Sequence, residues 1–137
     1  MFLDTSGLLC LHNKAEPQHL LAKKLFQQPR KKVTTSYVLA ELVTLPFVRG
    51  IARTRTLVFV RQLIQSGTTA VVWVDEALHL HAMDLLEKRT DKEYSLCDAA
   101  SFVLMREQQV AEALSTDHHF EQEGFIRLLA ESGPPIH

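Results

Sequence analysis

The stretch Thr69–Val74 (TAVVWV) is the clearest β-strand in the sequence. Its unbroken run of apolar and β-branched residues is typical of a strand that is buried on both faces of a parallel sheet. A helical pattern follows from Asp75 through Arg89, with acidic residues in its first turn and basic residues in its last, which suits the helix dipole. A buried strand followed directly by a helix predicts the crossover unit of an α/β fold.

The same alternation extends to both ends of the chain. Further strands are expected at residues 1–4, 33–35, 110–115 and 125–129, with helices at about 16–28, 38–45, 52–65 and 95–109. We therefore predict a single compact α/β domain with a mostly parallel central sheet of about five strands and helices on both faces. Residues 1–130 form this domain, and residues 131–137 form a C-terminal tail.

The composition excludes several broad classes of protein. The 137 residues are 46% hydrophobic and 23% charged, which is ordinary for a globular domain. Apolar runs stay far short of the roughly 20 residues that a membrane span needs, and the N-terminus lacks the features of a signal peptide. Cys10 and Cys97 lie in apolar sequence, which favours reduced thiols over a disulfide. We expect a cytoplasmic protein.

The charge is unevenly distributed along the chain. Between Lys23 and Arg61 there are nine basic residues and one acid, Glu41, so this segment carries +8 while the remainder carries −9. Such asymmetry indicates a side that faces a polyanion. The alternative is a set of ordinary solvated helix faces.

Four carboxylates have apolar or small neighbours: Asp4, Glu41, Asp98 and Asp117. Asp4 ends the first strand and Asp117 follows the strand at 110–115, and ligands of parallel sheets collect at the carboxyl ends of the strands. A local explanation is also available for three of them. Asp4 and Asp117 could cap the helical turns that follow, and Asp98 could form a capping box with Ser95.

Glu41 is harder to explain locally. It lies inside an apolar helical run, with no Lys or Arg within four residues on either side. A buried carboxylate there would cost several kcal/mol unless something compensates it. A divalent metal is one compensator, because it accepts several carboxylates at once. A tertiary salt bridge or an exposed helix edge is the alternative.

These residues together resemble the PIN-domain ribonucleases, whose prokaryotic members include the VapC-type toxins of toxin–antitoxin pairs. The resemblance covers essentially the whole chain and rests on four motifs in order: Asp4-Thr5-Ser6, Ala40-Glu41-Leu42, Ser95-Leu96-Cys97-Asp98 and the run from Ser115 to Phe120 (STDHHF). It implies a parallel α/β sheet, a Mg²⁺ or Mn²⁺ site and cleavage of single-stranded or loop RNA. In that family the acids that match Asp4, Glu41, Asp98 and Asp117 bind the metal and carry catalysis, and hydroxyls that match Ser6 and Thr116 support them.

We therefore expect a Mg²⁺- or Mn²⁺-dependent endoribonuclease, the toxin of a toxin–antitoxin pair, with RNA as substrate, a cognate antitoxin as partner and a homodimeric state. The RNA-binding candidates in the basic segment are Arg49, Arg53, Arg55 and Arg61. One alternative is a catalytically inactive interaction or RNA-binding module on the same fold. Another is a Mg²⁺-dependent phosphoacceptor domain, although those usually carry a second acid where Thr5 and Ser6 stand.

Two adjacent histidines follow the last of the four acids. His118 and His119 come directly after Asp117, but neighbouring residues seldom chelate one ion together. The sequence favours a loop that packs near the site over a metal-binding histidine pair.

Overall fold

The sheet contains five strands within the part of the chain that the computed structural model describes, residues 1–45 and 49–130. They are β1 (Phe2–Leu3), β2 (Lys32–Thr35), β3 (Thr69–Val72), β4 (Glu112–Leu114) and β5 (Ile126–Arg127). The strand order is β3-β2-β1-β4-β5, and every pairing is parallel. The predicted parallel sheet is confirmed, and the expected tail at residues 131–137 lies outside the described residues.

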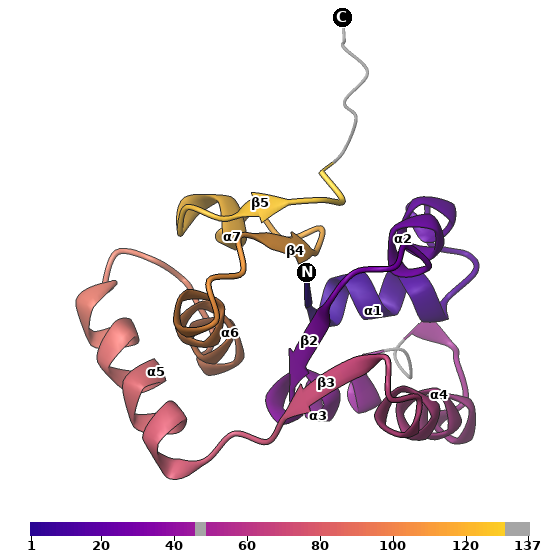
Figure 1. Cartoon of the computed structure of the whole chain (residues 1–137), viewed down its shortest axis with the longest axis horizontal. Helices are drawn as coiled ribbons and strands as arrows, with labels where there is room; N and C mark the ends of the chain where they lie inside the picture. The colour runs from indigo at the N-terminus through magenta and orange to yellow at the C-terminus, as the bar shows by residue number, and fades with distance from the viewer. Residues whose placement is uncertain (46–48, 131–137) are drawn as a thin grey trace, which may run out of the picture.

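Helices cover both faces of the sheet (Figure 1). On one side lie α5 and α6, and on the other lie α1, α2 and α4. The bounds are α1 (Thr5–His12), α2 (His19–Phe26), α3 (Ser36–Thr44), α4 (Arg53–Gln65), α5 (Glu76–Lys88), α6 (Leu96–Glu107) and α7 (His119–Gln122). In residues 1–45 and 49–130, no helix combines the length and the apolar character that a membrane crossing requires.

One helix begins later than the sequence pattern predicts. The pattern places a helix from Glu16, whereas α2 begins at His19. Asn13 explains the delay, because its side-chain oxygen accepts from the backbone N–H of Ala15 at 3.1 Å and its amide donates to Glu16 at 3.0 Å. These bonds stabilise a turn in place of the first helical residues.

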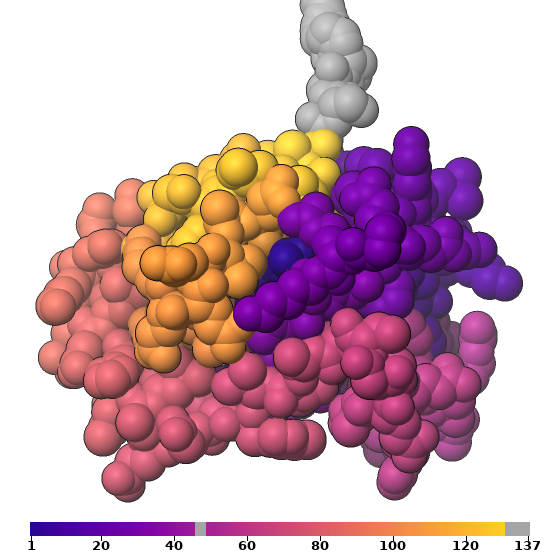
Figure 2. Space-filling view, viewed as in Figure 1, coloured from indigo at the N-terminus to yellow at the C-terminus, as the bar shows by residue number. Residues whose placement is uncertain are grey.

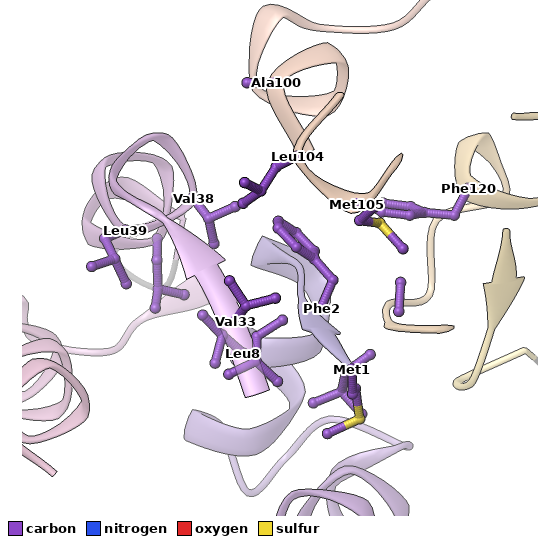
Figure 3. Close-up of a cluster of buried hydrophobic side chains, with 14 of the residues drawn as sticks. Met1, Phe2, Leu8, Val33, Val38, Leu39, Ala100, Leu104, Met105 and Phe120 are labelled. Carbon is purple, nitrogen blue, oxygen red and sulfur yellow. The ribbon is translucent and has the colours of Figure 1, made fainter. Parts of the chain in front are cut away.

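The first strand lies at the centre of the core. Phe2 and Leu3 are fully buried, and in Figure 2 the indigo N-terminal residues show only as a small area between later segments. The side chain of Phe2 lies among those of Val38, Leu104 and other buried residues (Figure 3). Because β1 is enclosed by β2, β4 and the helices, the core fixes the position of the residue that follows it.

The register places several polar residues at one edge of the sheet. Leu3 pairs with Leu114, so Asp4 follows β1 beside Ser115, which follows β4. The backbone N–H of Asp4 continues the ladder by donating to the carbonyl of Leu114 at 3.2 Å. Carboxyl ends of parallel strands form the usual ligand-binding edge of such sheets.

Gly7 allows α1 to approach this edge. A Cβ on Gly7 would lie 1.9 Å from the carbonyl oxygen of Leu114, which is far inside van der Waals contact. The first turn of α1 therefore rests directly on the backbone at the end of β4. This contact brings Ser6 to Ser115, whose hydroxyl oxygens are 3.1 Å apart.

We predict that Gly7→Ala destabilises the protein. An alanine in a helix interior normally gains about 1 kcal/mol over glycine, but here the backbone must shift, and overpacking of this kind costs about 1–3 kcal/mol. Urea unfolding measures the change. Gly67→Ala is the control, since its Cβ would meet nothing within 4 Å and only its positive φ of 71° opposes it. A Gly7→Ala protein as stable as the wild type would contradict the close contact.

Candidate metal centre at the carboxyl edge of the sheet

Asp4 is the most enclosed of the four acids, with 4% of its surface exposed. Its Oδ2 accepts hydrogen bonds from the hydroxyl groups of Ser6 at 2.8 Å and Ser115 at 2.7 Å. Asp4 occupies the N-cap position of α1, but its side chain makes no capping hydrogen bond. The capping interpretation of Asp4 is therefore wrong, and the carboxylate instead binds two hydroxyl groups, one from the first turn of α1 and one from the end of β4.

The environment of Asp4 weakens its acidity without preventing ionisation. Burial raises the pKa of Asp4 from 3.8 to about 6, and the charge of Asp98 adds to the rise. The hydrogen bonds from Ser115 and Ser6 act in the opposite direction, because they favour the charged form. Asp4 is thus a poorly solvated carboxylate that still ionises near neutral pH.

The two hydroxyl groups are themselves fixed by the segment after β4. The backbone N–H of Thr116 donates to Ser6 Oγ at 3.0 Å, and that of Asp117 donates to Ser115 Oγ at 2.9 Å. Thr116 therefore reaches Ser6 through its backbone, and the second hydroxyl on Asp4 belongs to Ser115. In the sequence Ser115 is the last residue of the strand expected at 110–115, and the structure shows that it lies level with Asp4 on the neighbouring strand.

Asp98 has two sets of contacts at the start of α6. Its Oδ2 accepts from the backbone N–H of Ser95 at 3.1 Å, and its own N–H donates to Ser95 Oγ at 3.0 Å, so the predicted capping box is confirmed. The same oxygen lies 3.2 Å from His119 Nδ1. Burial raises the pKa of Asp98, and the neighbouring charge of Asp117 raises it further. The Asp98 carboxylate therefore takes part in the capping box and still interacts with Asp117.

Asp117 also has a local and a tertiary role. Its Oδ1 accepts from the backbone N–H of His119 at 2.9 Å, but the N-cap residue of α7 is His118, so the prediction that Asp117 caps this turn is wrong. The same oxygen lies 3.4 Å from His119 Nδ1. The imidazole of His119 therefore stands between Asp98 and Asp117.

Glu41 is exposed, which corrects the expectation that its carboxylate is buried. On α3 the buried stripe runs through Val38, Leu39 and Leu42, so Glu41 falls at the solvent edge despite its apolar neighbours. It still belongs to the same region. Burial raises the pKa of the Cys97 thiol, and the charges of Glu41, Asp4 and Asp98 raise it further, in that order.

Asp4, Asp98 and Asp117 are thus electrostatically connected at one edge of the sheet, and Glu41 lies close enough for its charge to act on Cys97. Asp4 interacts with Asp98, Asp98 with Asp117, and Glu41 acts on the thiol that lies among them. Such mutual repulsion favours the binding of a divalent cation, and the donor set consists of oxygens that suit a hard ion. Cys97 itself is held in its thiol form and is a packing residue.

Glu123 is a buried carboxylate that stabilises this region, and no motif in the sequence pointed to it. Glu123 accepts from Arg89 at 3.0 and 3.2 Å, from Arg106 at 2.6 Å and from the Tyr94 hydroxyl at 3.0 Å. Burial opposes its ionisation, but the bonds from Arg89 and Arg106 outweigh it and lower the pKa of Glu123. The Tyr94 ring also contacts the His119 ring edge-on, with centroids 5.2 Å apart. Glu123 therefore ties α5, α6 and α7 together behind His119.

The arginines of the basic segment lie beyond the other end of α1. Arg49 Nε is 3.7 Å from Glu16 Oε2, and the charge of Arg55, after the larger effect of burial, lowers the pKa of His12. Asp4 precedes α1 and His12 ends it, and eight helical residues span about 12 Å. Arg53 and Arg61 are exposed on α4.

Comparison with known proteins identifies the family. The model of the PIN domain family matches residues 1–125. The 23S rRNA-specific endonuclease VapC20 of Mycobacterium tuberculosis, from strains CDC 1551 / Oshkosh and ATCC 25618 / H37Rv, is 31% identical over 132 residues, which cover 96% of this chain and 99% of the relative. The crystal structure of M. tuberculosis VapC20, described as a Sarcin-Ricin loop cleaving toxin, matches with a TM-score of 0.83 at 32% identity and covers 91% of this chain and 95% of that one.

The chain belongs to the PIN domain family, as its four motifs suggested. In this fold Asp4 follows β1 and Asp117 lies three residues after β4, at the carboxyl edge of the five-stranded parallel sheet. PIN-domain nucleases generally use divalent metal ions.

Proposed function

We propose that this chain is an endoribonuclease that requires Mg²⁺ or Mn²⁺ and that acts as the toxin of a toxin–antitoxin pair. The observation that carries the proposal is the buried carboxylate of Asp4, held by two hydroxyl groups and exposed to the charge of Asp98 at the ligand-binding edge of the sheet. Structural carboxylates are rarely buried beside others of the same charge unless they serve a site.

Asp4, Asp98, Asp117 and Glu41 are the proposed metal-binding and catalytic residues. When bound, a divalent ion at such a site lowers the pKa of a water molecule and offsets negative charge that develops on a phosphodiester. The protein's own contribution is orientation. Ser6 and Ser115 fix Asp4, while Ser95 fixes Asp98.

The substrate proposal is a loop or single-stranded segment of RNA, with the 23S rRNA Sarcin-Ricin loop as the first target to test. It rests on the names of the VapC20 relatives and on the +8 charge of residues 23–61. A cognate antitoxin protein is the proposed partner that restrains the nuclease.

We also propose a homodimer, because α4 presents apolar side chains to solvent. Leu57, Val58 and Ile64 are 40%, 55% and 39% exposed, and Phe59 is partly buried. Phe47 and Val48 are further apolar residues of the sequence, and they lie outside the described residues. Sedimentation at micromolar concentration should show a dimer, and a strictly monomeric protein would contradict this proposal.

We predict that Asp98→Asn abolishes metal-dependent RNA cleavage with little loss of stability. The amide oxygen of asparagine can still accept from the Ser95 N–H, so the cap survives, but the charge at the site is lost. Ser95→Ala is the matched variant, because it removes the cap and keeps the charge. It should lose roughly 0.5–1 kcal/mol and still cleave.

Single-turnover cleavage of a Sarcin-Ricin loop RNA in excess Mg²⁺ and in excess Mn²⁺, together with melting in chelator, measures both effects. An active Asp98→Asn protein would contradict the role of Asp98. A wild-type protein that binds RNA but cleaves none with either ion would instead favour the inactive RNA-binding module.

We predict that the double variant Arg53→Ala, Arg55→Ala binds RNA more weakly without unfolding. Each phosphate contact that is lost should reduce the slope of log K against log salt concentration by ~0.7 for a single strand. Fluorescence anisotropy at several salt concentrations measures the slope. Lys88→Ala, which removes an exposed charge at the end of α5, is the control. An unchanged slope in the double variant would show that these arginines are ordinary solvated surface.

A further inference from the structure

We infer that Asp117, His118 and His119 form a binding site for a borderline divalent ion such as Zn²⁺, with Asp98 in reach as a fourth ligand. The sequence favoured a packing loop here, because adjacent histidines seldom converge. The structure brings one ligand atom from each of the three residues within 4.8 Å of one another.

The separations of the ligand atoms fit a single ion. Four ligands at the usual zinc bond lengths of about 2.0–2.2 Å lie about 3.4 Å from one another in a tetrahedron. Asp117 Oδ1 is 3.4 Å from His119 Nδ1 and 3.7 Å from His118 Nδ1. His119 Nδ1 is also 3.2 Å from Asp98 Oδ2. Small side-chain adjustments would bring the ligand atoms of Asp117, His118 and His119 into bonding distance, and Asp98 adjoins them through His119.

The surroundings hold these ligands in place. The backbone N–H of His119 bonds to Asp117 Oδ1, and the Tyr94 ring packs against the His119 imidazole. Supporting contacts of this kind orient metal ligands and raise affinity. The side chain of His118 is 65% exposed, whereas that of His119 is 18% exposed, so an ion can enter from the His118 side.

The ligand chemistry separates this site from the oxygen-only acid cluster. Imidazole nitrogen suits Zn²⁺, Co²⁺ and Ni²⁺, whereas Mg²⁺ strongly prefers oxygen ligands and retained water. The two sites share Asp117 and Asp98. An ion bound at the histidines would therefore remove two carboxylates from the acid cluster, and it would inhibit RNA cleavage. This consequence rests on the proposed function, but binding of the ion does not.

Cobalt is the probe for the test, because four-coordinate Co²⁺ absorbs visible light far more strongly than six-coordinate Co²⁺. The whole chain is titrated with Co²⁺ as wild type, as His118→Asn and as the matched control His81→Asn. His81 is an equally exposed histidine on α5 that lies 4.0 Å from a single carboxylate, that of Glu107. We expect one strongly absorbing Co²⁺ per wild-type and His81→Asn chain, displaced by Zn²⁺ and retained in millimolar Mg²⁺. His118→Asn should bind at least tenfold more weakly.

Weak absorption typical of six-coordinate Co²⁺, or equal affinity of His118→Asn and wild type, would overturn the site. RNA cleavage in Mg²⁺ with added Zn²⁺ then separates the two proposals. Zn²⁺ should inhibit the wild type at concentrations that leave His118→Asn active. If Co²⁺ binds as expected but the wild type cleaves no RNA in Mg²⁺ even before Zn²⁺ is added, the ion site stands and the proposed nuclease function fails.

Discussion

Two hydrogen bonds to one oxygen of Asp4, from Ser6 and Ser115, link the fold of this protein to its candidate site. Each donor comes from a different segment, one from the first turn of α1 and one from the end of β4. They meet only because Gly7 lets α1 rest on the Leu114 carbonyl. The parallel register of β1 and β4 therefore also determines where the Asp4 carboxylate lies.

The site combines burial and like charges, which destabilise the fold, with hydrogen bonds that offset part of this destabilisation. Burial and the charge of Asp98 both disfavour the ionised form of Asp4. Hydroxyl donors offset part of this cost at Asp4, and the cap at Ser95 does the same at Asp98. The network around Glu123 is a separate reinforcement, in which two arginines and a tyrosine neutralise a buried carboxylate and hold α7 against α6. A bound cation would remove the repulsion that remains.

Much of the fold could be predicted from local sequence, because buried strands and capped helices have short-range patterns. The run Thr69–Val74 and the Ser95–Asp98 capping box both led to correct elements. The expected burial of that strand on both faces is wrong, because β3 is an edge strand that is only partly buried and Trp73 after it is 63% exposed. Glu41 was wrongly expected to be buried, because apolar neighbours in the sequence do not show which face of a helix packs against the core. The convergence of Glu123 with Arg89, and of His118 with His119, depends on tertiary packing and on ring orientation, for which the sequence carries no local signal. The roles of the four acids were suggested by family resemblance and remain proposals.

The pH dependence of stability tests the central claim, that Asp4 is a buried carboxylate prepared for a cation. With a pKa of about 6 in the folded protein, Asp4 keeps a proton that the unfolded chain has already lost at the same pH. The contribution of Asp4 to the free energy of unfolding therefore falls as pH rises from 4 to 7, by roughly 3 kcal/mol without metal. Urea unfolding in chelator should show this decline in the wild type and much less of it in Asp4→Asn. Saturating Mn²⁺ at pH 7 should restore more stability to the wild type than to Asp4→Asn. Equal pH profiles, or equal stabilisation of both proteins by Mn²⁺, would contradict the account.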